Sequence, residues 1–133
     1  MEKYKEIEHT ADLELKIYGK DKKELFKNAL LALNNKLEPK TKEEKTKRII
    51  KVESEDLSTL LVDFLNEVIS LGAVKNETYN EIKFIDFTDK RLEVKLKGKK
   101  VKSFRNEIKA TSYHKAEIKK KEKRYQINII FDI

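Results

Sequence analysis

The chain of 133 residues contains no cysteine, no tryptophan, one proline, three glycines and two histidines. The absence of cysteine excludes disulfides, thiolate nucleophiles and cysteine-ligated metal centres, so a reducing compartment is expected and the protein is predicted to be cytoplasmic. The three glycines stand far apart, which excludes the glycine-rich loops that cradle nucleotide phosphates. Two histidines are too few for an imidazole-based metal site unless carboxylates supply the other ligands. No apolar run approaches the length of a membrane span, so no membrane partner is expected.

Charge is what the sequence has in abundance. Charged residues make up 41% of the chain and hydrophobic residues 38%, with a net charge of +7. Residues 97–124 hold twelve Lys or Arg and three Glu, so this segment carries +9 and the remainder −2. Any surface for a polyanionic partner is therefore expected in the C-terminal third. The length predicts a single domain over residues 1–133 with one core.

The periodicity of apolar residues predicts an α+β fold, with two helices packed on a mostly antiparallel or mixed β-sheet. The predicted elements are a strand at residues 6–19, a helix stopped by Pro39, a solvated loop at 40–47, a strand at 48–54, a core helix ending at Gly72, a hairpin over 81–98 turning at 88–90, and strands at 106–119 and 124–133 separated by a charged turn at 119–123.

Both predicted helices carry start signals. Asp21 and Glu24 form a capping-box pattern before the first helix, and Glu55-Asp56 precedes the second. Asp63 and Glu67 lie four residues apart on the polar side of the second helix, where we expect them to face solvent.

The C-terminus places two carboxylates close together. By alternation the Asp132 side chain points away from the apolar face, and the α-carboxylate of Ile133 is one residue away. Such a pair is costly unless a cation or several donors compensate, and calcium and magnesium take oxygen ligands of this kind. Asp12 projects from the first strand and would add a third carboxylate from a neighbouring position in the sheet. The alternative is that Asp12 is a turn residue and Asp132 an ordinary terminal charge.

Four motifs occur in order along the chain: "HTAD" at residues 9–12, "EDLSTLLVDFLNE" at 55–67, "EIKATSYH" at 107–114, and a chain that ends in "DI". Together they resemble the motifs of the archease family over nearly the whole chain. The resemblance implies a non-enzymatic protein cofactor of the RtcB-type, GTP-dependent RNA ligase that joins tRNA halves in tRNA splicing. Such a cofactor promotes guanylylation of the ligase and multiple turnover.

The resemblance also implies a divalent-cation site, with calcium expected first and magnesium or manganese as alternatives. Its ligands would be Asp12, Asp132 and the carboxyl group of Ile133. On this interpretation the "HTAD" segment bends the first strand at the site, and His9 supports a ligand or packs beside it.

Three residues near the third motif have two interpretations. Lys109, Tyr113 and His114 either contact the ligase or belong to a strand with an exposed lysine and packed rings. RNA itself is expected to bind at most weakly, or through the ligase. Relatives tend to have an apolar residue where this chain has Thr111. The segment before Asn106 is shorter than the loop that is common in relatives at this place.

Two other functions stay open. The first is a basic RNA-binding module acting in RNA processing without ligase activation, suggested by the basic segment and its interleaved Phe104, Tyr113 and Tyr125. The second is a metal-dependent hydrolase, which requires an open cation position and a general base. Ser112 and His114 are two residues apart, a weak sign of a serine nucleophile. Nothing beyond the carboxylates favours the hydrolase.

Overall fold

The computed structural model describes residues 2–7 and 12–133. His9 lies outside the described residues. The elements in chain order are β1 (Tyr4–Ile7), β2 (Leu13–Gly19), α1 (Lys22–Leu37), β3 (Pro39–Glu53), α2 (Leu57–Lys75), β4 (Glu77–Phe87), β5 (Arg91–Phe104), β6 (Ala110–Ser112), β7 (Lys119–Lys121) and β8 (Arg124–Asp132).

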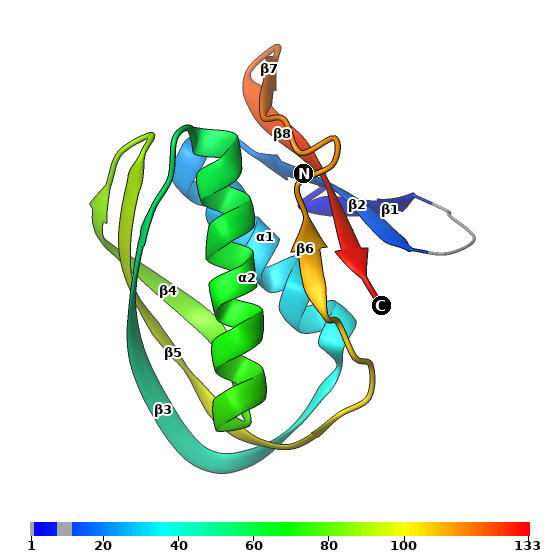
Figure 1. Cartoon of the computed structure of the whole chain (residues 1–133), viewed down its shortest axis with the longest axis vertical. Helices are drawn as coiled ribbons and strands as arrows, with labels where there is room; N and C mark the ends of the chain where they lie inside the picture. Colours follow the sequence, from blue (N-terminus) through cyan, green and yellow to red (C-terminus); the bar gives the residue numbers. More distant parts are fainter. Residues whose placement is uncertain (1, 8–11) are drawn as a thin grey trace.

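The strands form two antiparallel sheets. The order in the five-stranded sheet is β1-β2-β8-β6, with β7 also paired to β8, and the order in the three-stranded sheet is β3-β5-β4. Helix α1 packs on β2 and β4, and α2 packs on β6, β3 and β4, so both helices contact both sheets (Figure 1). The predicted α+β fold with two helices on antiparallel strands is confirmed, although the strands are divided between two sheets.

The predicted first strand is in fact two strands. β1 pairs antiparallel with β2, with Tyr4 opposite Ile17 and Ile7 opposite Glu14. The alternation that predicted one long strand is nevertheless correct within β2, where Leu15 and Ile17 have no exposed surface. Ile7 lies opposite Glu14 and therefore on the other face from Leu15 and Ile17, so the apparent alternation from Ile7 to Ile17 joined residues of two different faces.

Helix α1 begins and ends as the sequence predicts. The Asp21 carboxylate accepts a hydrogen bond of 2.8 Å from the Glu24 amide, and the Glu24 side chain accepts one of 3.0 Å from the Lys20 amide. The helix ends at Leu37. Glu38 follows with a φ of 46°, and Pro39 prevents continuation of the helix.

Helix α2 begins at the predicted cap but continues past the predicted end. The Asp56 carboxylate accepts a hydrogen bond of 2.8 Å from the Thr59 amide. Gly72 lies within the helix, which ends at Lys75 and is followed by the cap residue Asn76 with a φ of 55°. A Cβ on Gly72 would lie 2.8 Å from the Glu77 carbonyl oxygen, so glycine here permits a close approach of β4 and does not end the helix.

By length and composition alone, α2 could cross a membrane. Its packing identifies it as the predicted core helix: Leu60, Leu61, Phe64 and Leu65 have no exposed surface and belong to the same cluster as the buried residues of both sheets. The core helix of a folded domain has the same composition as a membrane span.

The predicted loop at residues 40–47 is wrong, because β3 runs without interruption through this segment. It pairs with β5 from Pro39 opposite Phe104 to Glu53 opposite Arg91, with register shifts near Thr41. Residues 40–45 are exposed. Main-chain pairing with β5 holds Lys40, Thr41 and Lys45 on either side of the unpaired residues 42–44, so no alternation of buried side chains could reveal this part of the strand.

The predicted strand at residues 106–119 is also mostly wrong. Only β6 forms in it, and β7 forms within the predicted turn at 119–123. The predicted last strand is confirmed as β8, whose inner face buries Ile127, Ile129 and Phe131. The predicted hairpin turn at 88–90 lies between β4 and β5, as expected.

Candidate functional site at the chain end

The register of β2 and β8 brings two of the predicted cation ligands to one end of the five-stranded sheet. Leu13 at the start of β2 lies opposite Phe131 near the end of β8. Asp12 directly precedes Leu13 and Asp132 directly follows Phe131, so continuation of this register places the two aspartates at adjacent positions. Both are exposed, as is Ile133, whose exposed fraction is 58%.

The other neighbour of β8 contributes a lysine. Ala110 of β6 lies opposite Asp132, and the Lys109 amide donates a hydrogen bond of 2.8 Å to the Asp132 carbonyl oxygen. The backbone of Asp132 is therefore fixed by β6 while its side chain stays exposed. Lys109 is exposed at the same end of the sheet.

The donor chemistry of this sheet end fits a hard cation. Within residues 2–7 and 12–133, no three side chains of His, Asp or Glu form a group that could hold a metal ion. The third predicted ligand is the main-chain carboxylate of Ile133, so the set would consist of two side chains and the chain end. All three groups offer oxygen only, which suits calcium or magnesium, and their exposure lets water complete the coordination.

Tyr113 and His114 lie away from these carboxylates, beyond the opposite end of β6. The Tyr113 hydroxyl donates a hydrogen bond to the Asp63 carboxylate of α2 while 56% of the residue stays exposed. This hydrogen bond, and to a lesser degree burial, raises the pKa of the Tyr113 hydroxyl above its ordinary value. His114 is exposed, and its amide donates to the Ser112 hydroxyl at 3.0 Å. The two rings are therefore on the surface and are not packed in the core.

Asp63 was expected to face solvent, and this expectation is wrong. Its carboxylate accepts from Tyr113 and, at 2.5 Å, from the Ser54 hydroxyl. Glu67 is exposed as predicted. The spacing within α2 identified the polar side of the helix, but a segment far along the chain covers one end of that side.

Polar side chains of α2 hold the segment around β6 in place, and the sequence did not reveal this role. The side-chain amide of Asn66 accepts a hydrogen bond of 2.7 Å from the Thr111 backbone N–H and donates one of 3.1 Å to the Thr111 carbonyl oxygen. Ser58 accepts a hydrogen bond of 2.9 Å from the Ile118 amide. Asn66 thus satisfies a strand backbone as a neighbouring strand would. An asparagine inside an apolar helix was the one available signal.

The hydroxyl of Thr111 is buried. Only 3% of the residue is exposed, and its Oγ1 has no hydrogen-bond partner in the described part of the chain. The position thus surrounds a hydroxyl group with an environment suited to an apolar side chain.

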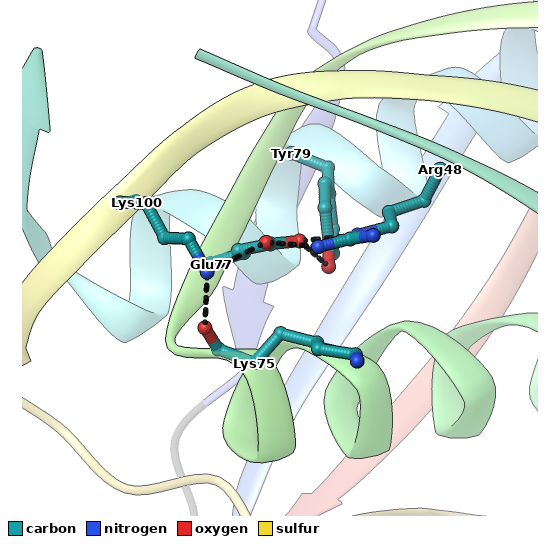
Figure 2. Close-up of polar contacts among 5 residues, drawn as sticks. All are labelled: Arg48, Lys75, Glu77, Tyr79 and Lys100. Atoms are coloured by element: carbon teal, nitrogen blue, oxygen red, sulfur yellow. Dashed lines mark hydrogen bonds and ion pairs between the residues drawn. The ribbon is translucent and has the colours of Figure 1, made fainter. Parts of the chain in front are cut away.

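A second polar cluster lies near the C-terminal end of α2, centred on the buried carboxylate of Glu77 (Figure 2). Arg48 donates to both oxygens, from Nε at 2.8 Å and from Nη2 at 2.6 Å. The Tyr79 hydroxyl donates to Oε1 at 2.8 Å, and Lys100 lies 3.1 Å from Oε2. Lys100 also donates to the carbonyl oxygen of Lys75 at 3.2 Å.

The donors around Glu77, led by Arg48, hold the pKa of its carboxyl at about 2. A strongly shifted pKa often marks a functional site. Here both carboxylate oxygens are occupied by donors from the same three-stranded sheet, so the group has no free position for a substrate. We interpret the cluster as structural.

The predicted basic segment does not form one surface. Its first part belongs to β5 in the three-stranded sheet, and its last part forms β7 in the five-stranded sheet. Lys119, Lys120 and Lys121 of β7 are all exposed.

Comparison with known proteins shows which family the chain resembles. The Archease protein family (MTH1598/TM1083) matches residues 4–133. A protein archease of Methanosarcina barkeri is 32% identical over 98% of this chain and 95% of its own length. A protein archease of Pyrococcus abyssi is 31% identical over 90% of each chain.

Solved structures agree. A crystal structure from Thermotoga maritima, described as an archease and possible chaperone, is 25% identical, with a TM-score of 0.74 over 97% of this chain and 96% of its own. The solution structure of protein 1598 from Methanobacterium thermoautotrophicum has the same fold, with a TM-score of 0.73 over 100% of both chains at 24% identity. The family match over residues 4–133 and the relatives above 30% identity show that this chain belongs to the archease family.

Proposed function

We propose that this protein is a non-enzymatic cofactor of an RtcB-type, GTP-dependent RNA ligase in tRNA splicing, and that it promotes guanylylation and multiple turnover of the ligase. Its membership of the archease family supports the proposal, together with one feature of the fold. The first motif directly precedes β2 and the last motif ends β8. These two strands are neighbours in the sheet, so Asp12 and Asp132 lie at the same sheet end. The lack of cysteine favours action in the cytoplasm.

The test is a ligation assay with a purified, folded ligase, GTP and cleaved tRNA halves, with and without this protein. We expect guanylylation to become faster and each ligase molecule to complete more ligations. The protein alone should neither bind GTP covalently nor join or hydrolyse RNA. Ligation or hydrolysis by the protein alone would contradict the proposal.

The same assay separates a cofactor from a chaperone, the role described as possible for the Thermotoga maritima protein. A chaperone would raise the yield of active ligase during refolding without changing the turnover of folded enzyme. A cofactor of turnover should stimulate a ligase that is already folded, at substoichiometric amounts.

The proposed cation site consists of Asp12, Asp132 and the Ile133 carboxyl group. A bound calcium ion would neutralise carboxylates that otherwise repel one another, so binding should stabilise the fold. At a hundredfold excess of calcium over its dissociation constant the gain is about 2.7 kcal/mol. The residues' own part is to present oxygen ligands at a fixed sheet end, next to the Lys109 backbone that holds Asp132.

Two variants test this site by thermal melting with and without calcium. Asp12→Asn removes one charge at constant shape, and a C-terminal extension converts the Ile133 carboxylate into an amide carbonyl without changing a side chain. Both should lose most of the calcium-dependent rise in Tm. Asp89→Asn, in the exposed turn between β4 and β5, is the matched control and should keep it. If both test variants retain the full rise, the site does not exist.

Tyr113, His114 and Lys109 are the proposed contacts with the ligase. Tyr113 is suited to this role because its ring is exposed while its hydroxyl is held by Asp63. Tyr113→Ala should weaken ligase stimulation with little change in the calcium-dependent Tm, because it lies beyond the opposite end of β6 from Asp132.

A further inference from the structure

The outer face of the three-stranded sheet is covered by lysines. Strands β3, β5 and β4 turn their apolar side toward the helices, where Ile50, Val52, Leu92, Val94 and Leu96 are part of the core. The residues between them point outward. The outward lysines, here called the lysine face, are Lys45, Lys47, Lys51, Lys83, Lys95, Lys97 and Lys99.

The lysine face joins segments that are distant in the sequence. Lys45, Lys47 and Lys51 come from β3, in the segment predicted to be a loop and the strand after it, and Lys83 comes from β4. Only Lys97 and Lys99 belong to the predicted basic segment. This surface therefore became visible only with the pairing of the three strands.

Like charges stand directly opposite one another on this face. Lys45 lies opposite Lys99 and Lys47 opposite Lys97 across β3 and β5. A third pair joins Lys95 to Lys83 across β5 and β4. Directly opposed like charges destabilise a sheet, so the arrangement favours a bound anion that would remove the repulsion.

Acidic residues do not neutralise the face. Four acids also point outward on this sheet and are fewer than the lysines: Glu81 lies opposite Lys97, Glu93 opposite Lys51, Asp86 opposite Glu93, and Glu53 opposite Arg91. Within the described residues, none of the seven lysines is within 4.0 Å of a carboxylate. Other charges of the chain do form ion pairs, as Lys22 does with Asp89 and as Arg91 does with Asp86 at the end of the same sheet.

The spacing suits an extended polyanion better than a single small anion. The row from Lys45 to Lys51 on β3 covers about 20 Å at roughly 3.4 Å per residue. A nucleic-acid backbone presents negative charge continuously over such a distance. The other large outward side chains of the face are aliphatic: Ile49 and Ile85 are 58% and 50% exposed, and the aromatic rings of Phe84 and Phe87 belong to the core side.

We propose that the lysine face binds the phosphate backbone of structured RNA, without reading its sequence. The absence of outward aromatic rings among the described residues of this face argues against stacking of single-stranded bases, which is the usual way of holding unpaired nucleotides. The choice of RNA among polyanions rests on the proposed function, which brings the protein next to an RNA substrate. The contact itself does not require the ligase.

The test is a direct binding measurement, with no ligase present, between the whole protein and a fluorescently labelled RNA hairpin. The variant Lys47→Gln, Lys97→Gln, Lys99→Gln removes three charges from the lysine face. The matched control Lys119→Gln, Lys121→Gln, Lys123→Gln removes three exposed charges from the β7 region. Both variants have the same net charge, so a difference between them reports the location of the contact.

We expect the face variant to weaken RNA binding at least tenfold and the control to change it less than twofold. Between about 50 and 200 mM salt, the slope of log affinity against log salt should fall in magnitude by about 2 to 3 for the face variant only. The face variant should melt at the same or a higher temperature than the parent, because its opposed like charges are gone. A lower Tm would contradict the arrangement of charges that motivates the proposal.

Other outcomes overturn the proposal. One is an equal loss of RNA affinity in the two variants, or a loss of RNA affinity in the control alone. The others are absence of RNA binding by the parent at about 50 mM salt, and binding of the parent to phosphatidylserine vesicles but not to RNA. Stimulation of ligase guanylylation, which involves no RNA, should be unchanged in the face variant. A parent that binds RNA but does not stimulate guanylylation would contradict the proposed function alone, so the two failures can be told apart.

Discussion

The buried carboxylate of Glu77 should be one of the largest single contributors to the stability of this fold. Glu77→Gln keeps the size of the side chain but replaces one acceptor oxygen by an NH₂ group. That group would face Arg48, Lys100 or the Tyr79 hydroxyl, all of which are donors. The variant therefore removes a charge and places a new donor group against two existing donors inside the protein.

The magnitude follows from the titration of the carboxyl group. Its partners lower the pKa of Glu77 from its ordinary value of 4.5 to about 2. At about 1.4 kcal/mol per pH unit this corresponds to roughly 3 kcal/mol in favour of the ionised folded state. The Glu77 side chain has no exposed surface, but Arg48 and Lys100 are 34% and 29% exposed, so water can partly solvate them in the variant. We therefore expect Glu77→Gln to lower the free energy of unfolding at pH 7 by about 2 to 3 kcal/mol.

The pH dependence gives the sharper assay. Because the pKa of Glu77 is lower in the folded than in the unfolded protein, its contribution is complete above pH 4.5 and is lost as the pH falls toward 2. Other carboxylates also titrate in this range, so the useful quantity is the difference between parent and variant. Urea unfolding at several pH values should show this difference constant from pH 7 to pH 5 and decreasing below pH 4.5.

An exposed ion pair provides the control. Asp89 pairs with Lys22 at 2.8 Å, with side chains 62% and 38% exposed. Asp89→Asn should cost less than about 1 kcal/mol, as surface pairs usually do. The reasoning would be refuted if Glu77→Gln lowered the free energy of unfolding by less than about 0.5 kcal/mol. It would also be refuted if the difference in free energy of unfolding between parent and variant did not decrease toward pH 2.

Three further substitutions probe the backbone. Gly98→Ala would place a Cβ 1.7 Å from the Thr78 carbonyl oxygen, so β4 and β5 must separate, and urea unfolding should show a loss of about 3 kcal/mol or more; a loss under about 1 kcal/mol would contradict this contact. Asn66→Ala removes both hydrogen bonds to Thr111 and should cost about 1 to 3 kcal/mol, with faster amide exchange at Thr111 as the local readout; unchanged exchange would be the contrary result. Asn76→Ala should cost about 1 kcal/mol and Asn76→Gly nothing, because the φ of 55° favours glycine; equal melting temperatures for the two variants would exclude this explanation.

The helices were predictable because their signals are local. Asp21 and Asp56 each bond an amide three residues later, and the buried positions of both helices repeat at helical spacing. The end of α2 was misplaced because a glycine near a helix end usually stops it. At Gly72 the requirement for glycine comes from Glu77, in the next element.

The strands that were missed lack such signals. β3 begins with exposed residues that pair with β5 through the main chain, and β7 consists of three exposed lysines that pair with β8. A local sequence pattern indicates which side chains are buried. It does not indicate where an exposed segment pairs through its backbone.

For the candidate site, the sequence by itself determined the chemistry: oxygen donors at Asp12, Asp132 and Ile133, no thiolates, and a chain rich in lysine. The tertiary structure alone decided which of these groups meet. Asp12 and Asp132 are 120 positions apart and become neighbours only through the register of β2 and β8. The lysine face likewise exists only because β3 and β4 both pair with β5. The physical reason is that charge and ligand type belong to single residues, whereas proximity between distant residues is set by strand register, which depends on how both sheets bury their apolar faces against the two helices.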